Sequence, residues 1–516
     1  MNADRIPRIP VVIVGAGPTG ITAATLLAQY GVDCLILERW PGVYQKPRAV
    51  HLDDEVYRIL ARLGIAGEFA AISRPTLGLR LLDKRFRVLG EFRRDPGVGV
   101  HGFPQANMFD QPELESLLRA NLNRFPCAEL RGGADVTDIS PVGDGFVRVT
   151  FTDRSDGRVH QVDAEYVLGC DGANSTVRSR MGSTMRDLHF AQRWLVVDVA
   201  TDADLHQWDG VYQVCDPVRA GTYMRIGKSR YRWEFQLLPG ENSADFDTIT
   251  TLHPLIAPWT TGVPISELTL LRVAEYTFRA QIADRWRRGN MFILGDAAHL
   301  TPPFIGQGMG AGVRDAMNLA WKVAAVHSGA LAPDVLDTYE QERKPHTRSL
   351  IRLALNMGRA MTGGGRPGNV ARHLVLPRLR LIPGLREKVV DSTTPRLRAC
   401  ALVTRSFLSR LPGTLCPNPI MPSGRRLDDV VGADFLFVTA TPLSYANHTA
   451  LRRRGLAVLT AVPGGDLANW LRRGRAQAAL VRPDRTVMRT ARDPAALQAW
   501  TVNHLQAPCP APLHSV

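Results

Sequence analysis

Cysteine is scarce in this chain of 516 residues, and its seven cysteines are scattered. They form no CxxC pair, so we expect neither a disulfide framework nor a metal site, and the pattern suits a reducing cytoplasm. Long apolar runs are missing too, since no stretch approaches the ~20 residues that span a bilayer. The first apolar run, residues 9–14, passes directly into glycines rather than into a cleavage-type segment. The sequence therefore predicts a cytoplasmic protein that does not contact a membrane.

Acidic residues are outnumbered, with 49 Asp and Glu against 63 Lys and Arg and a net charge of +14. Most of the excess lies between Arg343 and Arg410, where fifteen basic residues accompany only Glu387 and Asp391. Leucines alternate with these basic residues at helix-like spacing, which predicts a basic helical segment over 346–420. We interpret it as a solvated helical face; a patch that attracts anionic substrate or NAD(P)H is the alternative. Nucleic-acid binding is not expected.

The N-terminal sixty residues have the pattern of a dinucleotide-binding unit. The β-branched run IPVVIV predicts a buried parallel strand, GAGPTG follows, and a helix then leads to a second strand that ends at Glu38. The glycines permit a tight turn, close approach to a pyrophosphate and helix–strand packing, and the helix N-terminus attracts phosphate. The Glu38 carboxylate is placed to accept hydrogen bonds from ribose hydroxyls. The predicted dinucleotide-binding residues here are Gly15, Gly17, Gly20, Glu38 and Arg39.

Two motifs far downstream indicate which dinucleotide is bound. VDAEYVLGCDGANSTVR contains a strand followed by a DG pair, and NMFILGDAAHLTPPFIGQGMGAGVRDAMNLAWKVA contains a strand, a GD pair, a proline loop, a glycine cluster and a helix. Together with GAGPTG, these motifs resemble the single-component flavoprotein aromatic hydroxylases, the family that includes p-hydroxybenzoate hydroxylase. PRAVHLDDE, FDQPELE, QVCDPVR and GQGMGAGVRDAMNLAWK are most similar to its 3-(3-hydroxyphenyl)propionate hydroxylase branch. The resemblance covers about residues 8–345 and, more loosely, the C-terminal part.

The resemblance implies an α/β fold with three parts. They are a Rossmann-like FAD-binding domain built on a parallel sheet, an inserted antiparallel-sheet substrate domain, and a C-terminal thioredoxin-like domain. We expect the FAD-binding domain at 1–185 and 282–345, the substrate domain at 186–281, the basic helical segment at 346–420 and the thioredoxin-like domain at 421–516. The last has no redox CxxC, so we assign it structure or oligomer contacts rather than chemistry.

The resemblance also assigns cofactor residues. Arg48 and Gln111 occupy positions that hold the FAD phosphates and ribityl chain, although Arg48 equally suits a surface ion pair. Asp171 lies where the nicotinamide cofactor is handled, with Arg178 supporting the loop; a structural role for this pair is the alternative. Asp296, at the end of a strand, is placed to accept hydrogen bonds from ribityl hydroxyls, or it is simply a helix N-cap. The glycine-rich helix start is predicted to face the flavin through Gly306, Gly308, Met309 and Gly310.

Between the DG and GD motifs, WLVVDVA, GVYQVC and SRYRWEFQLLP predict strands of an antiparallel sheet. In the last, aromatic residues alternate with Arg232, Glu234 and other polar residues, so one face is aromatic and the other polar. The sequence does not tell which face meets the flavin. Core packing of the aromatic side chains is one interpretation, and substrate contact is the other. The candidates for substrate contact are Tyr212, Tyr223, Trp233 and Phe235.

The candidates closest to the chemistry are His51, Pro302 and Pro303. The prolines stiffen the loop after the GD motif, which in the family brings backbone carbonyls near the substrate hydroxyl. His51, close to Arg48, is the first candidate for a group that tunes the phenol, and a structural histidine is the alternative.

The resemblance implies that a reduced nicotinamide passes hydride to FAD, that O2 forms a C4a-hydroperoxyflavin, and that this transfers oxygen to a phenolic ring. No second GxGxxG follows a strand, so NADH or NADPH is expected to bind transiently. The expected partners are therefore a small aromatic substrate, O2 and NAD(P)H, with a homodimer as a further expectation. A 3-(3-hydroxyphenyl)propionate-like phenol is the first substrate candidate. The alternatives are a tailoring hydroxylase of a polycyclic polyketide or antibiotic, a flavin dehydrogenase that does not use oxygen, and a flavin-bound regulator.

Overall fold

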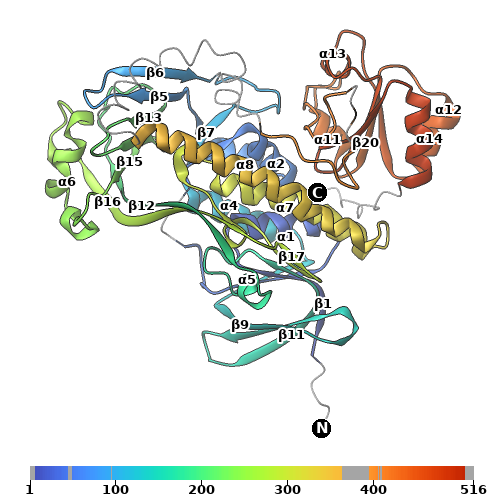
Figure 1. Ribbon diagram of the computed structural model, residues 1–516, viewed down its shortest axis with the longest axis horizontal. Coiled ribbons are helices and arrows are strands. Elements are labelled where there is room, and N and C mark those ends of the chain that lie inside the picture. Colours follow the sequence, from blue (N-terminus) through green and yellow to red (C-terminus); the bar gives the residue numbers. More distant parts are fainter. Residues whose placement is uncertain are drawn as a thin grey trace.

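The computed structural model describes residues 6–44, 49–94, 96–362, 394–404, 406 and 409–505 (Figure 1). Two large sheets and the helices between them make up the body of the molecule, and a smaller sheet with its own helices forms the C-terminal part.

The first sheet brings the three sequence motifs to one edge. Its central strands pair in parallel in the order β18, β11, β1 and β2, with bounds Met291–Ile293, Val159–Gly169, Arg8–Val14 and Cys34–Glu38. GAGPTG follows β1, the DG pair follows β11 and the GD pair follows β18. Because carboxyl ends of parallel strands share one edge, motifs about 280 residues apart meet there. The outer strands are β8 (Ala128–Gly132), β17 (Arg287–Arg288), β9 (Ala134–Pro141) and β10 (Val147–Asp153).

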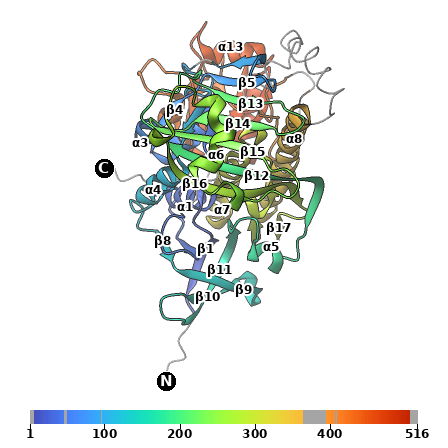
Figure 2. The same ribbon diagram turned by 90° about the vertical axis from the view of Figure 1, so that its left-hand side faces the viewer.

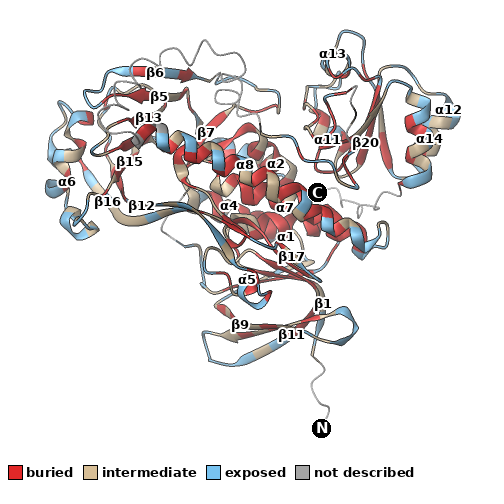
Figure 3. Cartoon of the chain, viewed as in Figure 1, coloured by how far each residue is buried: buried red, intermediate tan, exposed pale blue. Residues whose placement is uncertain are grey.

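Helices cover this sheet and supply most of the buried apolar surface. The helix α1 (Pro18–Gln29) contacts α7 (Gly308–His327) extensively, and the long α8 (Asp337–Thr362) runs alongside α7 in Figure 1. Figure 3 shows α1, α7 and the central strands as the most continuously buried elements. The other helices of this part are α2 (Asp54–Leu63), α3 (Ala66–Ile72), α4 (Gln111–Leu122) and α5 (Thr176–Arg180). A small sheet of β3 (His51–Asp53), β7 (Ala106–Phe109) and β4 (Ser73–Pro75) lies beside α2.

The second sheet is antiparallel over most of its width, and Figure 2 shows its strands stacked one above another. Its order is β19 (His299–Leu300), β16 (Thr269–Ala283), β12 (Met185–Ala200), β15 (Arg230–Gln236), β14 (Gly221–Arg225), β13 (Val211–Val214), β5 (Gly78–Leu82) and β6 (Val88–Arg93). The helix α6 (Ile249–Ile256) packs on the face of this sheet that carries Tyr212, Tyr223 and Trp233.

The strands β5 and β6 correct one sequence expectation. Residues 78–93 were expected in the FAD-binding part, yet β5 pairs in parallel with β13 of the second sheet. Order along the chain does not reveal such a pairing, because the two strands are separated by more than 120 residues. The other expected domain limits stay a prediction.

The C-terminal part contains a four-stranded sheet in the order β21 (Leu456–Thr460), β20 (Phe435–Thr439), β22 (Ala478–Val481) and β23 (Val487–Ala491). The strands β20 and β21 are parallel, and β22 and β23 form an antiparallel hairpin. Its helices are α11 (Leu427–Val431), α12 (Tyr445–Arg453), α13 (Asp466–Arg473) and α14 (Pro494–His504). A βαβαββα order of this kind supports the thioredoxin-like assignment, which stays a prediction.

Buried ion pairs join the C-terminal part to the body. Arg482 donates to Glu342 on α8 at 2.6 Å, and Lys322 on α7 donates to the same carboxylate at 2.9 Å. On the other side, Arg58 on α2 pairs with Asp428. Charges that are this buried need their partners, so these contacts fix how the C-terminal part is seated.

The basic helical segment predicted for 346–420 is only partly helical. The prediction holds to Thr362, the last described residue of α8, and residues 363–393 lie outside the described residues. Residues 394–404 and 409–420 contain no helix, because prolines at 395, 412, 417 and 419 interrupt them. Within the described residues, no helix is long and apolar enough to cross a membrane.

Candidate active site

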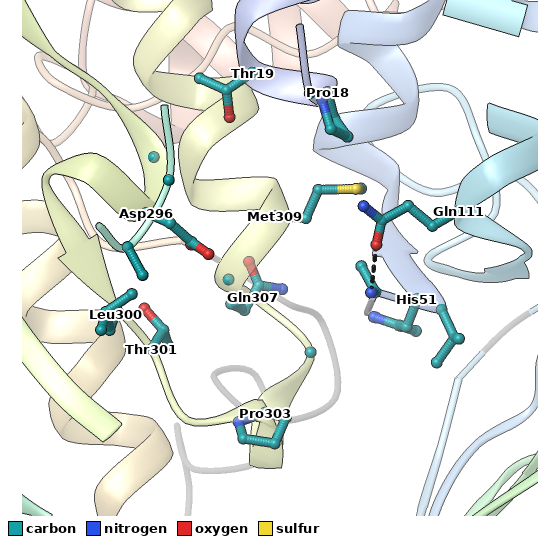
Figure 4. A pocket seen from close by; sticks show the side chains of 18 of the residues that line it. Pro18, Thr19, His51, Gln111, Asp296, Leu300, Thr301, Pro303, Gln307 and Met309 are labelled. Carbon is teal, nitrogen blue, oxygen red and sulfur yellow. Dashed lines mark hydrogen bonds between the residues drawn. The ribbon is translucent and has the colours of Figure 1, made fainter. Parts of the chain in front are cut away.

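A cavity of about 830 Å³ lies between the motif edge of the first sheet and one face of the second (Figure 4). Its wall on the first-sheet side comes from the three motifs, and its opposite wall comes from β12, β13, β14, β15 and β16. A volume of this size suits a cofactor together with a small ligand.

The glycines of GAGPTG are required by close contacts. Gly15 has φ +100°, and a side chain on it would overlap the Cys170 carbonyl of the DG motif. A Cβ on Gly20 would overlap the Gly15 carbonyl. Gly17, in contrast, has no protein atom within 4 Å of an added Cβ, and it lines the cavity. Gly15 and Gly20 therefore hold the turn, while Gly17 leaves room for a ligand.

The acidic residue at the end of β2 stabilises the same turn. One Glu38 carboxylate oxygen accepts a hydrogen bond from the Ala16 N–H at 2.7 Å, and the other accepts from the Trp40 N–H at 3.0 Å. Glu38 and Arg39 both line the cavity, which is where residues that bind a dinucleotide must lie. The remaining lone pairs of the Glu38 carboxylate can accept hydrogen bonds from ribose hydroxyls.

The DG motif has clear structural contacts. Asp171 accepts hydrogen bonds from the Ser175 hydroxyl at 2.5 Å and from the Val177 N–H at 3.1 Å, which hold the start of α5. Burial raises the pKa of Asp171, and these bonds oppose that rise. Arg178 donates to the Ala173 carbonyl and to the Ala297 carbonyl beside the GD motif. These contacts favour the structural alternative for the pair, and Asp171 still lines the cavity.

The GD motif meets α1 through a threonine that the sequence reasoning missed. A Cβ on Gly295 would lie 2.9 Å from Thr19 Oγ1, and one on Gly312 of α7 would overlap the same oxygen. Asp296 follows, and Figure 4 shows its carboxylate pointing into the cavity. On α7, Asp315 accepts the Gly295 N–H at 3.1 Å and holds this turn from behind.

The N-terminus of α7 opens on the cavity. Gly306 (φ +62°), Gly308 and Met309 line it, as predicted. Gln307 is the N-cap residue, but its side chain donates to Asp53 and accepts from Arg314 instead of capping the helix. Gly310 was predicted to face the flavin, but it does not line the cavity and instead packs against Val56 and Arg314.

Gln111 begins α4 and reaches the cavity from the opposite side (Figure 4). Its Oε1 accepts the Ala49 N–H at 2.7 Å, and its Nε2 donates to Glu115 at 2.7 Å. Arg48, the other predicted phosphate-contacting residue, lies outside the described residues.

These residues fit FAD. Both α1 and α7 point N-termini without a side-chain cap at one cavity, and such ends bind anionic and electron-rich groups. Gly17, Glu38 and Arg39 would hold the pyrophosphate and ribose. Asp296 and Gln111 would hold the ribityl chain, with Gly308 and Met309 beside the ring system.

His51, on β3, faces the loop after the GD motif. Its Nε2 lies 3.4 Å from Arg94 Nη1, and because guanidinium only donates, Nε2 is the acceptor and Nδ1 carries the proton. Within the described residues, Nδ1 has no hydrogen bond of good geometry, and the Gly306 backbone of the GD loop lies beside it. Burial and the nearby Arg94 charge lower the pKa of His51 to about 4, so the ring is neutral at pH 7.

The two prolines of the GD loop differ in position. Pro303 lines the cavity, whereas Pro302 is buried beneath it and does not, which corrects its predicted placement. Gln213 of β13 fixes this loop, because its Nε2 donates to the Phe304 carbonyl at 3.0 Å.

The four aromatic residues predicted to contact substrate belong to a core cluster instead. They pack around Trp259 and Leu252 on the side of the second sheet away from the cavity, and none of them lines it: Tyr212, Tyr223, Trp233 and Phe235. Core packing, the other sequence interpretation, is therefore correct. Successive residues of a strand point to opposite faces of the sheet. The residues that alternate with these aromatic side chains therefore face the cavity.

The cavity face of that sheet contains the residues that sequence reasoning missed. Apolar side chains near the GD loop include Trp194 and Phe278, whose rings lie 5.8 Å apart, and Phe304. Polar cavity-lining residues on the central strands are Gln213, Thr222, Arg232 and Glu234. Their alternation with the aromatic residues was visible in the sequence, but the orientation of the sheet was not.

Comparisons with known proteins agree with this geometry. The family model described as "FAD binding domain" matches residues 8–354. A 3-(3-hydroxy-phenyl)propionate/3-hydroxycinnamic acid hydroxylase from Burkholderia vietnamiensis (strain G4 / LMG 22486) is 34% identical over 446 residues, covering 85% of this chain and 80% of that protein. A protein from Rhodococcus jostii (strain RHA1), named as a probable NADH-specific resorcinol 4-hydroxylase, is 32% identical and covers 98% and 96% of the two chains.

Solved structures share the fold. The flavin-dependent monooxygenase PieE, in complex with FAD and substrate, superposes with a TM-score of 0.78 at 24% identity over 96% of this chain and 99% of that one. A ternary complex of aklavinone-11 hydroxylase with FAD and aklavinone gives the same values. The chain therefore belongs to the FAD-binding-domain family and, within it, to the FAD-dependent aromatic monooxygenases.

Proposed function

We propose that this monooxygenase hydroxylates a single-ring phenol whose second substituent is meta to the hydroxyl. The compounds in the names of the two relatives are phenols of this kind, since 3-(3-hydroxyphenyl)propionate, 3-hydroxycinnamate and resorcinol all have a meta substituent. 3-(3-Hydroxyphenyl)propionate is the first compound to test and resorcinol the second. A polycyclic polyketide, the alternative, is supported only by the fold likeness to aklavinone-11 hydroxylase.

The observation that carries the proposal is the half-buried His51–Arg94 pair in the wall of the flavin cavity. A neutral His51 presents its Nδ1–H toward the GD loop, and the Arg94 guanidinium lies behind it. A hydrogen-bond donor backed by a positive charge stabilises a phenolate oxygen. Ionisation of the phenol activates the ring carbons ortho and para to that oxygen, so we expect an ortho-hydroxylated, catechol-type product.

The other residues would position the ring and exclude water. Trp194, Phe278 and Phe304 offer aromatic surface, and Pro303 with the Gln213–Phe304 hydrogen bond fixes the loop over the ring. FAD bound in its cradle supplies electron transfer from a reduced nicotinamide and the activation of O2. Asp171, at the cavity edge, remains our proposal for the region where NADH or NADPH arrives.

The test is a screen of phenols for stimulated NAD(P)H oxidation by the purified flavoprotein, with mass analysis of products. We expect meta-substituted phenols to accelerate NAD(P)H oxidation and to gain one oxygen atom. Acceleration by polycyclic substrates alone would support the alternative. If no phenol is hydroxylated, the proposed function is wrong.

We also propose that the protein works in the cytoplasm, does not bind nucleic acid or membranes, and forms a homodimer. Free cysteines in the described residues support the location. Light scattering at several concentrations tests the dimer, and a single monomeric mass would contradict it.

A further inference from the structure

Three polar side chains form one row across the cavity face of the second sheet. Gln213 on β13 pairs in register with Thr222 on β14, which pairs with Glu234 on β15. All three line the cavity, and they are 4%, 7% and 9% exposed. We call Gln213, Thr222 and Glu234 the polar wall.

Within the part of the chain that the structure describes, the acceptor oxygens of the polar wall have no hydrogen-bond partner. Gln213 Oε1 is buried and makes no hydrogen bond within the described residues. The side chains of Thr222 and Glu234 also make no hydrogen bond to a described residue. A buried acceptor such as Gln213 Oε1 is rarely left in this state, so a ligand that fills this space would complete its hydrogen bonding. Together these residues present amide, hydroxyl and carboxylate oxygens, a set rich in acceptors.

Cationic groups near the polar wall are already engaged. Arg232 donates to both oxygens of Asp198, at 2.7 and 3.0 Å, from a fully buried position. Arg94 contacts His51 and donates to the Gln105 carbonyl at 3.3 Å. A carboxylate placed against the wall would therefore meet Glu234 beside cations that already have partners, and burial of two like charges is costly. Arg279 also lines the cavity, but it lies on β16 and not in the polar wall.

We propose that the polar wall selects substrates whose meta substituent is an uncharged hydrogen-bond donor, a hydroxyl rather than a carboxylate. This inference rests on the proposed function and refines it. A substrate hydroxyl donates to Glu234 or Gln213, while His51 holds the phenolate at the other end of the ring. Burial raises the pKa of Glu234, as expected for a carboxyl in a poorly solvated wall.

Three ligands of similar shape test whether the polar wall prefers a donor, a charged or an apolar meta substituent. 3-(3-Hydroxyphenyl)propan-1-ol carries a donor, 3-(3-hydroxyphenyl)propionate carries a charge, and 3-propylphenol carries neither. Binding is measured from the perturbation of the bound-flavin absorbance, and kcat/KM from hydroxylated product. For the wild-type protein we expect the alcohol to bind about tenfold more tightly than either other ligand.

Glu234→Gln removes the charge and keeps an acceptor. We expect it to bind the acid about tenfold more tightly than the wild type does, with the alcohol changed less than about threefold. Glu275→Gln is the matched control, because Glu275 lies on β16 of the same sheet, pairs with Arg193 and does not line the cavity. The control should leave all three affinities unchanged.

Two outcomes would overturn the inference: tighter binding of the acid than of the alcohol by the wild type, or an unchanged acid-to-alcohol ratio in Glu234→Gln. If the ligands are hydroxylated without discrimination, the polar wall is wrong and the proposed function stands. If none is hydroxylated or perturbs the flavin, both fail. Retained flavin and an unchanged Tm show that the variant is folded.

Discussion

The two walls of the cavity are built in different ways. On the cofactor side, positions are fixed by backbone: Gly15 and Gly20 tolerate no side chain, and helix N-termini face the ligand. On the substrate side, side chains of a sheet face the cavity, and the backbone makes the same ladder whichever residues are present. The cofactor wall therefore leaves a spaced motif in the sequence, whereas the substrate wall leaves only an alternation.

The largest effect should come from the cofactor wall. Gly20→Ala places a Cβ onto the Gly15 carbonyl, so the turn must shift, and we expect the purified protein to retain less than ~10% of its flavin. Gly67→Ala is the control, since an added Cβ there meets no atom within 4 Å. Flavin content per chain is read from absorbance. Full flavin content in Gly20→Ala would mean that this turn does not form the cradle.

The next effect concerns His51. His51→Phe removes the donor to the phenolate, and we expect kcat to fall by about 10²-fold at pH 7 with flavin retained. The variant should recover activity as pH rises toward ~10, where a free phenol ionises by itself. The wild type should show no inflection near pH 6.5, because the pKa of His51 is about 4 and the ring is neutral throughout.

In that pH experiment, His51→Gln keeps an N–H donor and should retain more activity than His51→Phe. Equal loss in both variants, without recovery at high pH, would assign His51 a structural role instead.

A pair of substitutions compares the two faces of the second sheet. Thr222→Val on the cavity face should weaken binding of 3-(3-hydroxyphenyl)propan-1-ol about fivefold, with a change in unfolding free energy below ~1 kcal/mol. Trp233→Phe on the core face should lower the unfolding free energy by about 1–3 kcal/mol and leave ligand affinity unchanged. Ligand titrations and urea denaturation measure both. Reversed results would mean that the aromatic face meets the substrate after all.

The smallest effect concerns Asp54, the first residue of α2. Burial and the neighbouring Asp53 and Glu55 raise its pKa to about 8, above its ordinary value near 4. The folded state therefore favours the protonated form, and stability from this group is lost as pH rises through 8. Asp54→Asn should raise the Tm by ~2 °C or more at pH 8.5 and by less at pH 6. A difference that does not grow with pH would contradict the raised pKa.

Much of the cofactor wall could be predicted from the sequence. Gly15, Gly17, Glu38 and Asp296 were predicted at this edge and all line the cavity, because strand, glycine spacing and acidic residue each follow from the geometry of a parallel sheet edge. Their contacts with FAD stay a prediction. Thr19 was missed, since its role depends on how closely Gly295 and Gly312 approach it.

Less of the substrate wall could be predicted from the sequence. The alternation in β15 was correct, but which face is turned to the cavity depends on contacts with α6 and Trp259, far away in sequence. The pairing of β5 with β13 likewise depends on tertiary contacts rather than on local periodicity.

The most direct measurement uses isotopically labelled oxygen. The purified flavoprotein is given NADH or NADPH, resorcinol or 3-(3-hydroxyphenyl)propan-1-ol, and ¹⁸O2, and the product is analysed by mass. One cavity that holds flavin on one wall and a phenol on the other predicts one ¹⁸O atom in the product, ortho to a phenolic hydroxyl. Oxidation of NAD(P)H that yields only hydrogen peroxide, or product oxygen that comes from water, would contradict it.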